Sequence, residues 1–434
     1  MADIAGLRAF SEIQERDEAP FFTGRDAYIT HIQKACANAL TKITYRQSIT
    51  SATRLFYGAP GAGKTSLLNE IAKRSARRDF GDINPLVVRL ASEKSLNNED
   101  DIVLQIAETL GKDRVFRTTV HSDTSVNAAI PAIGSGGVTK GHVQDPPAAT
   151  FFNLKHIYKD IVPKCPILLC IDEIQNIGPK ASEMMSLLHQ GEHGLPIIPI
   201  YAGLGNSLNV MMDHGISRPV DGYIHSVGAL AKDEARTAVT EMLTRFEVDQ
   251  NGAMIDWPDT LAERSDSWPQ HLHNAMRALA LELIRPEVNG NLKQVDTAAV
   301  FNQEERMRMR AYRWRVSEML SDHRELTAQV MHHVVTSDLT RPEVKTIIED
   351  VHEKTPHKLP ANMTVDSFFD HLAHRGLLQE FDQQDADGKI RDVIRCPIPS
   401  LATYIMERGG VDPSYDPVVL ASKPPTKNND ENAF

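Results

Sequence analysis

The chain shows three short apolar segments in its first half, each of which runs into glycine or acidic residues. Residues 52–57 (ATRLFY) and 167–171 (ILLCI) are two of them, and the third lies within 195–207 (LPIIPIYAGLGNS). A continuous apolar run of this length is typical of a strand buried on both faces of a parallel sheet. Residues 66–78 follow the first segment with helical spacing, so the pattern there predicts a strand, a loop and a helix.

The second half of the chain has mainly helical patterns. Three predicted helices lie between 231 and 300, and a strongly basic helix covers 301–320. Residues 325–408 then predict three helices, two strands joined by a hairpin turn at Asp387 and Gly388, and a closing helix. The last residues, 409–434, contain four prolines and no aliphatic periodicity, so we expect a disordered tail.

The loop after the first strand carries the strongest chemical signal. Its sequence, GAPGAGKT, matches G-x-x-x-x-G-K-[ST] at every fixed position, a pattern whose backbone amides surround phosphate oxygens. The lysine would reach the β- and γ-phosphates of ATP, and the threonine hydroxyl would bind Mg²⁺. The candidate nucleotide-binding residues are therefore Gly58, Ala59, Pro60, Gly61, Ala62, Gly63, Lys64, Thr65 and Ser66.

Polar residues follow the other two apolar strands. Asp172 at the end of the second strand would hold Mg²⁺, and Glu173 would act as the general base for the attacking water. The alternative is that both acids cap the next helix. After the third strand, Asn206 is a candidate sensor of the γ-phosphate or of water, with Ser207 nearly as good and a polar turn residue as the alternative.

Length, composition and charge limit the class of protein. A chain of 434 residues with 41% hydrophobic residues predicts two or three globular domains. There is no apolar run long enough for a transmembrane helix and no secretory signal pattern, and four scattered cysteines favour a reducing cytoplasm. The net charge of −11 argues against coating of nucleic acid by bulk charge, although it leaves room for one basic face.

Taken together, these motifs resemble the AAA+ ATPases, in the branch shared by origin-recognition initiators, STAND-type signalling ATPases and transposition regulators. The resemblance covers about residues 15–408. It is carried by FFTGRDAYI (21–29), the phosphate loop, LLCIDEIQN (168–176), YAGLGNS (201–207), residues 215–230 and a C-terminal winged-helix pattern.

The resemblance implies an α/β fold, with a P-loop (AAA+/ASCE) parallel-sheet core, a helical lid and a C-terminal winged-helix domain. The expected division is a core at 1–230 with an insertion at about 118–148, a lid at 231–300, a basic connecting helix at 301–324, a winged-helix-like domain at 325–408 and a tail at 409–434. The insertion reflects the 108 residues (172 − 64) between the lysine and the acidic strand end. It is either a disordered insert or a functional loop.

The resemblance also assigns roles to residues outside the phosphate loop. It places Phe22, Gly24 and Arg25 near the adenine, although Arg25 could instead pair with an acid on the surface. Arg218 would be an arginine finger for a neighbouring subunit, or else a solvated arginine. One departure matters, because Gln270 stands where an arginine of the lid is expected, and Arg277 could substitute for it. This departure favours slow hydrolysis.

The basic helix and the winged-helix pattern bear on partners. Arg306, Arg308, Arg310, Arg313 and Arg315 could form a face for nucleic acid or an acidic partner, or could pair with nearby acids within a connecting helix. The third helix of the winged-helix pattern carries two acids and one arginine, which is poor chemistry for binding a phosphate backbone. We therefore expect this domain to bind protein or to pack on the ATPase core.

We therefore expect an ATP-hydrolysing molecular switch whose nucleotide state controls self-association and engagement of a protein partner or effector. The first alternative is a DNA-binding ATPase acting in replication initiation or transposition target selection. The second is a nucleotide-bound scaffold without turnover.

Overall fold

The computed structural model describes most of the chain. The described residues are 2–13, 20–45, 53–81, 83–90, 98–110, 150–159, 165–177, 181–191, 194–205, 207–213, 216, 223–384 and 390–409. The predicted insertion at 118–148 lies outside them. The predicted tail does too, apart from Gly409, which ends the last helix.

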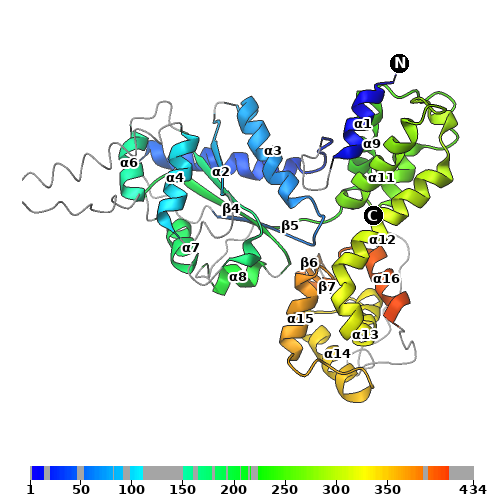
Figure 1. Ribbon diagram of the computed structural model, residues 1–434. Coiled ribbons are helices and arrows are strands. Elements are labelled where there is room, and N and C mark those ends of the chain that lie inside the picture. The colour runs from blue at the N-terminus through cyan, green and yellow to red at the C-terminus, as the bar shows by residue number, and fades with distance from the viewer. Residues whose placement is uncertain are drawn as a thin grey trace, which may run out of the picture.

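Five parallel strands form the central sheet of the first lobe (Figure 1). They are β1 (Arg54–Tyr57), β2 (Leu86–Arg89), β3 (Ile167–Ile171), β4 (Ile197–Gly203) and β5 (Ile224–Ser226), in the order β2-β3-β4-β1-β5. The predicted parallel-sheet core is confirmed. Because β4 lies between β1 and β3, the strand that leads to the phosphate loop and the strand that ends in acids finish at one edge, about 10 Å apart at ordinary strand spacing.

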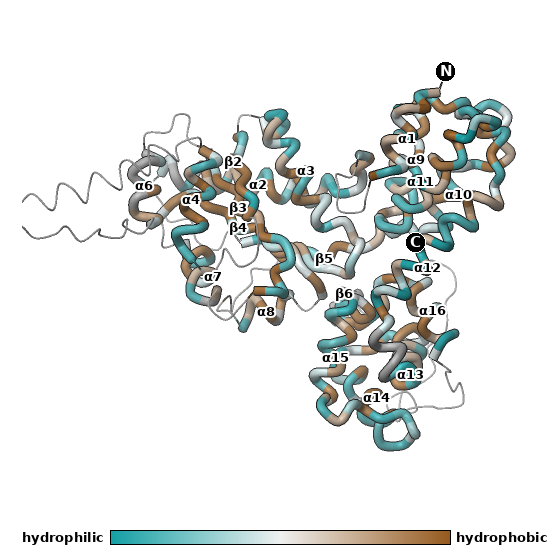
Figure 2. Tube along the Cα trace, in the orientation of Figure 1, coloured by the Kyte–Doolittle hydropathy of each residue, from teal (hydrophilic) through white to brown (hydrophobic). Residues whose placement is uncertain are grey.

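Helices cover both faces of this sheet because its strands are apolar on both sides. All five residues of β3 are buried, and alternate residues of β3 and β4 join different hydrophobic clusters. One cluster lies under α2 (Asp26–Thr44) and α3 (Lys64–Arg77). The other lies under α4 (Glu99–Thr109), α6 (Phe151–Lys159), α7 (Ala181–Gln190) and α8 (Ser207–Asp213). Figure 2 shows the strands β3 and β4 as hydrophobic segments inside this layer.

A second lobe is entirely helical and is called the lid below. It contains α9 (Lys232–Arg245), α10 (Trp257–Arg264) and α11 (Pro269–Leu283), close to the predicted helices. The N-terminal helix α1 (Ile4–Glu12) also belongs to it, because Leu7 and Phe10 are buried in the same cluster as α9 and α11. The assignment of the first residues to the core was therefore wrong: the apolar face of α1 finds its partner in the lid.

The long helix α12 (Thr297–Asp322) leads from the lid into a third, C-terminal lobe (Figure 1). This lobe contains α13 (Arg324–Thr336), α14 (Arg341–Lys354), α15 (Val365–His374), the antiparallel pair β6 (Gln379–Gln384) and β7 (Ile390–Arg395), and α16 (Pro399–Gly409). The element order is the one predicted for a winged helix, and membership of that class stays a prediction. None of the described helices is both long enough and apolar enough to cross a membrane.

Candidate nucleotide-binding site

The loop between β1 and α3 folds around a buried lysine. Lys64 is the first residue of α3, and its Nζ donates hydrogen bonds to the carbonyl oxygens of Gly58 (2.9 Å) and Ala59 (3.0 Å). Gly61 and Gly63 have φ angles of 84° and 87°, a region that residues with a side chain rarely occupy. The glycines thus allow the loop to curl over its own lysine, with the positive end of the α3 dipole beside it.

Burial weakens the charged form of Lys64. The residue is only 8% exposed, and burial lowers the pKa of its ammonium to about 8. Glu173 and Asp172 oppose this shift, whereas the positive charge of Arg315 adds to it. A phosphate group in the loop would favour the charged form, so the loop fits a nucleotide.

A hydroxyl and a carboxylate meet beside the loop. Thr65 Oγ1 donates a hydrogen bond of 2.7 Å to Asp172 Oδ2, which brings the two predicted magnesium ligands together across β4. Oxygen ligands of this kind are those that Mg²⁺ prefers, and the ion commonly keeps several of its waters. The pair therefore fits a magnesium ion held by Thr65 directly and by Asp172 directly or through water.

The neighbouring acid, Glu173, is held by the side chain of Gln175, a residue that no sequence motif singled out. Its backbone has a φ of 54°, which is unusual for a residue other than glycine. Gln175 Nε2 donates a hydrogen bond to Glu173 Oε2, and Gln175 Oε1 accepts one of 3.0 Å from the backbone N–H of Leu204. Gln175 thus links the acid after β3 to the end of β4, where the predicted sensor residue follows.

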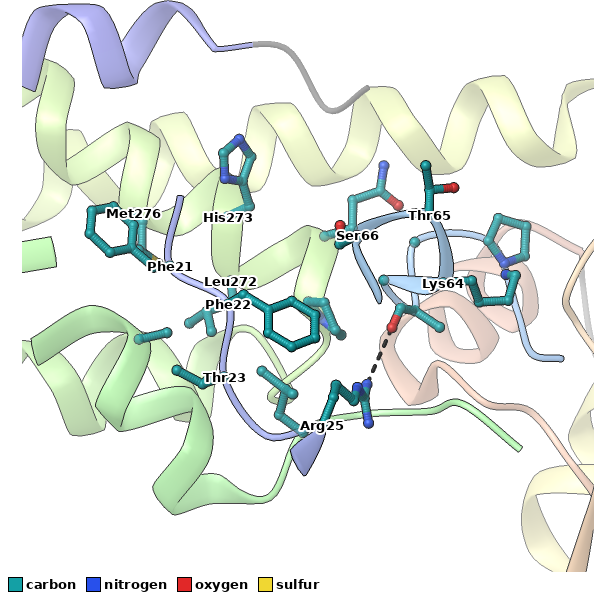
Figure 3. Close-up of a pocket in the computed structure, with 18 of the residues that line it drawn as sticks. Phe21, Phe22, Thr23, Arg25, Lys64, Thr65, Ser66, Leu272, His273 and Met276 are labelled. Carbon is teal, nitrogen blue, oxygen red and sulfur yellow. Dashed lines mark hydrogen bonds between the residues drawn. The ribbon is translucent and has the colours of Figure 1, made fainter. Parts of the chain in front are cut away.

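A cavity of about 440 Å³ lies over the loop, between the sheet core and the lid. Figure 3 shows Lys64 and Thr65 at one end of it, and Phe21, Leu272 and Met276 at the other. The first end is polar and carries positive charge, which suits phosphate groups, and the second is apolar, which suits a flat base.

The segment before α2 forms one wall of the cavity. Phe22 packs against the hydrophobic cluster of the sheet core, and the adjacent Phe21 packs against the cluster of the lid. Gly24 has a φ of 71°, and a Cβ at this position would lie 2.4 Å from Oε2 of Glu234 in α9. Only glycine fits this turn, so the segment can connect the two lobes closely.

Arg25 fastens the same wall to the phosphate loop. Its Nη2 donates hydrogen bonds to the carbonyl oxygens of Ala62 (3.2 Å) and Gly228 (2.6 Å), and the first of these is drawn in Figure 3. The side chain is buried, so the alternative that Arg25 pairs with an acid on the surface is wrong. Its two backbone contacts make Arg25 a positioning residue for the loop. Contact of Phe22, Gly24 and Arg25 with adenine stays a prediction.

Comparison with known proteins agrees with this geometry. Residues 52–202, about a third of the chain, match the family model described as an AAA domain. The chain carries an AAA domain. No curated protein sequence matches the chain.

Solved structures resemble the whole arrangement around the AAA domain. A Walker-type ATPase of Pyrococcus abyssi is 12% identical with a TM-score of 0.52, over 91% of this chain and 99% of that one. The ORC2 protein of Aeropyrum pernix is 14% identical with a TM-score of 0.45, over 92% and 97%. At such identities the first similarity shows a shared fold and nothing about shared activity, and the lower score of the second carries no argument. The predicted AAA+ P-loop fold is confirmed.

Two predicted site residues of the AAA domain cannot be placed. Asn206 and Arg218 lie outside the described residues, so their roles as sensor and arginine finger stay predictions. Ser207, the alternative to Asn206, is fully buried, and a Cβ on Gly203 would lie 2.2 Å from its hydroxyl. It does not line the cavity above the loop.

The lid residues around the predicted arginine position are arranged differently from the sequence prediction. Gln270 does touch the phosphate loop, since its backbone N–H donates to the carbonyl oxygen of Gly61 at 3.2 Å. Arg277, which was to substitute for the missing arginine, points elsewhere and donates to the carbonyl oxygen of Ser11 in α1 at 3.1 Å. That prediction was wrong. Arg315 of α12 lines the cavity and contacts Gln270, whereas Arg277 does not line it.

The C-terminal lobe also touches the phosphate loop. Gln379 Oε1 accepts a hydrogen bond of 3.0 Å from the backbone N–H of Ala59, and its Nε2 donates one of 2.6 Å to Ser226 Oγ at the end of β5. Gly376, with a φ of 73°, brings its backbone so close that a Cβ would lie 2.3 Å from Pro60 Cδ. Packing of this domain on the ATPase core was one of the two alternatives expected from the sequence, but the residues that make the contact, 320 positions apart, were not predicted.

The five arginines of α12 face different ways. Arg308 points inward and forms an ion pair with the fully buried Glu304, with 3.5 Å between Nε and Oε1, while Arg315 reaches the cavity. Arg306, Arg310 and Arg313 are exposed. The prediction of one basic face therefore holds for three of the five side chains.

Proposed function

We propose that the chain binds MgATP between the AAA domain and the lid, and hydrolyses it slowly. The observation that carries this proposal is the buried Lys64 under a glycine loop, next to the Thr65–Asp172 pair. Lys64 would bind the β- and γ-phosphates and neutralise charge there. Thr65 and Asp172 would hold the magnesium ion, which would supply positive charge that stabilises the charge developing on the phosphates.

Hydrolysis would use Glu173 as the base. A water oxygen would bond to the γ-phosphorus while the bond from that phosphorus to the bridging oxygen breaks, and ADP would leave. The proton lost by the water would pass to the Glu173 carboxylate. Gln175 would hold that carboxylate in position, because it bonds to both Glu173 and the end of β4.

The same proposal makes the nucleotide a switch. The lid, α12 and the C-terminal lobe all contact the phosphate loop, through Gln270, Arg315 and Gln379 respectively. A nucleotide that rearranges this loop would therefore alter all three contacts, and with them the surface offered to another copy of the chain or to a protein effector. Arg218 would complete the site of a neighbouring copy.

Calorimetry and phosphate release test the proposal. Wild-type protein should bind ATP in a magnesium-dependent manner, and Lys64→Met should abolish that binding while the fold is retained. Glu173→Gln should bind ATP as wild type does but release phosphate at least about 100-fold more slowly, since a positioned base contributes about 10²–10⁴-fold. If the two proteins released phosphate at the same rate, Glu173 would not be the base, and a scaffold without turnover would remain.

DNA binding is the second candidate function, and it rests on one observation. Trp314 is 85% exposed and lies on α12 next to the exposed Arg313 and one turn from the exposed Arg310. An aromatic ring between cations can stack on bases while the guanidinium groups contact phosphates. Duplex or single-stranded DNA bound with an affinity that falls steeply with salt would favour this function, and loss of that binding in Arg310→Gln/Arg313→Gln would locate it.

A further inference from the structure

The position of Arg315 at the phosphate end of the cavity has no counterpart in the motifs read from the sequence. Its Nη2 donates one hydrogen bond to the carbonyl oxygen of Pro60 in the phosphate loop (3.1 Å) and another to Oε1 of Gln270 in the lid (3.2 Å). One guanidinium thus touches the loop and the lid at the same time, although α12 belongs to neither.

Gln270 carries no charge of its own, but it positions the guanidinium of Arg315. Its backbone N–H bonds to Gly61, and a Cβ on Gly61 would lie 2.2 Å from Gln270 Oε1, so the amide lies directly on the loop. An arginine side chain at position 270 would compete with Arg315 for this space. The glutamine instead presents an amide oxygen, which accepts the hydrogen bond that Arg315 donates.

Two arginines and a lysine line the described cavity, and each contacts a different part of its wall. Arg25 bonds to Ala62 and Gly228 on the wall next to the apolar end, and Lys64 lies beneath the loop. Arg315 contacts the loop at Pro60. A phosphate oxygen would be a stronger acceptor for a guanidinium than the carbonyl oxygen of Pro60 or the amide oxygen of Gln270.

From this geometry we propose that Arg315 binds the γ-phosphate of ATP and distinguishes ATP from ADP, taking the place of an arginine on the lid helix. This rests on the proposed function, since it assumes that a nucleotide occupies the cavity. The planar guanidinium can keep its bond to Gln270 with one N–H and contact the phosphate with others. Its proximity to Lys64, whose pKa it helps to lower, agrees with two cations sharing one anion.

The proposal also connects nucleotide state with the C-terminal lobe. Tyr312 lies one helical turn before Arg315 on α12, and its hydroxyl is 2.7 Å from Ser400 Oγ of α16. A shift of Arg315 towards a γ-phosphate would displace this turn of α12 and strain the contact with α16. The C-terminal lobe would then differ between the ATP and ADP states without touching the nucleotide.

The test compares the affinities for MgADP and for the magnesium complex of a non-hydrolysable β,γ-imido ATP analogue. Arg315→Gln should weaken binding of the analogue about 10–100-fold, the range that corresponds to a charge-assisted hydrogen bond, and weaken MgADP binding less than about threefold. Arg315→Lys keeps the positive charge but not the planar set of N–H donors, so it should recover part of the lost affinity for the analogue. Glu305→Gln, at an exposed residue on the same helix, should change neither affinity.

Each other result has a definite meaning. Equal weakening of both nucleotides, or of neither, would overturn the assignment and leave Arg315 as a structural contact between the loop and the lid. If the glutamine variant does not fold, Arg315→Lys serves as the test. Weaker binding of the ATP analogue alone would support the proposal, and equally weaker binding of the analogue and MgADP would refute it. A wild-type chain that binds neither nucleotide would refute the proposed function itself.

Discussion

Replacing Gln379 by alanine would test whether the C-terminal lobe is held on the phosphate loop by the contacts described above. The side chain is 3% exposed and makes two hydrogen bonds across the interface, one from Ala59 N–H and one to Ser226 Oγ. Neither partner has an obvious replacement when the amide is removed. The variant therefore leaves a buried backbone donor unsatisfied at the phosphate loop.

The magnitude follows from these two bonds. Leaving the Ala59 N–H buried and unpaired costs about 1–3 kcal/mol, and losing the bond to Ser226 costs about 0.5–1.5 kcal/mol. We expect a total of about 2–4 kcal/mol, which would shift the docking equilibrium of the C-terminal lobe about 30- to 1000-fold towards the undocked form. The lid has a hydrophobic cluster of its own, whereas one continuous cluster joins one face of the sheet core to the C-terminal lobe, so these apolar contacts would still oppose undocking in the variant.

Hydrogen exchange and small-angle scattering measure this effect. In Gln379→Ala the amides of the phosphate loop should exchange faster, and the radius of gyration should rise, while the sheet strands remain protected. Glu353→Ala changes an exposed residue of the same lobe and should behave as wild type. Unchanged exchange at Ala59 in the Gln379 variant would refute the view that this side chain holds the interface.

Further predictions concern the site and its packing. Gln175→Leu should slow phosphate release about 10- to 100-fold through loss of the bond that orients Glu173, with MgADP affinity kept within about twofold, and a wild-type rate would contradict this role. The pKa of Lys64 is about 8, and a bound phosphate would raise it, so ATP affinity should be full below pH 8 and fall up to about tenfold per pH unit above it. Calorimetry in buffers of different ionisation enthalpy should show that binding takes up a proton near pH 9. An ATP affinity that does not change with pH would count against Lys64 as the phosphate ligand. In urea titrations Gly376→Ala should lower the free energy of unfolding by more than Gly81→Ala does. Gly81 also has a positive φ, but open space surrounds it. Equal losses of stability in the two variants would mean that the close approach of Gly376 to the loop is unimportant.

The parts of this molecule that the sequence predicted are those that depend on local pattern. The loop around Lys64 needs its glycines whatever structure follows it. β3 is apolar on both faces because helices cover both. Helix bounds in the lid and the C-terminal lobe agree with prediction to within a few residues, since caps and apolar spacing lie within the elements themselves.

The individual contacts between lobes were not predicted, because they join residues that are far apart in the sequence. The bond from Arg315 to Pro60 spans 255 positions, and nothing near either residue indicates the other. One signal was available on α12: Arg308 and Arg315 share a face with the apolar Tyr312 at spacings of four and three, which marks an inward face. Treating all five arginines as one charged surface overlooked this helical phase.

The neighbouring rings of Phe21 and Phe22 restrict how the lid can swing. One ring is embedded on the lid side and the other on the core side, and their Cα atoms are joined by a single peptide unit of about 3.8 Å. Translation of the lid away from the core at this corner would move a ring into water. Because both rings are only partly buried, this would cost less than the about 1.5–3 kcal/mol of a fully buried ring. Rotation about the corner leaves both rings seated. The pair would thus act as a pivot. The cavity would open at its phosphate end, while the end expected to hold the base stays closed.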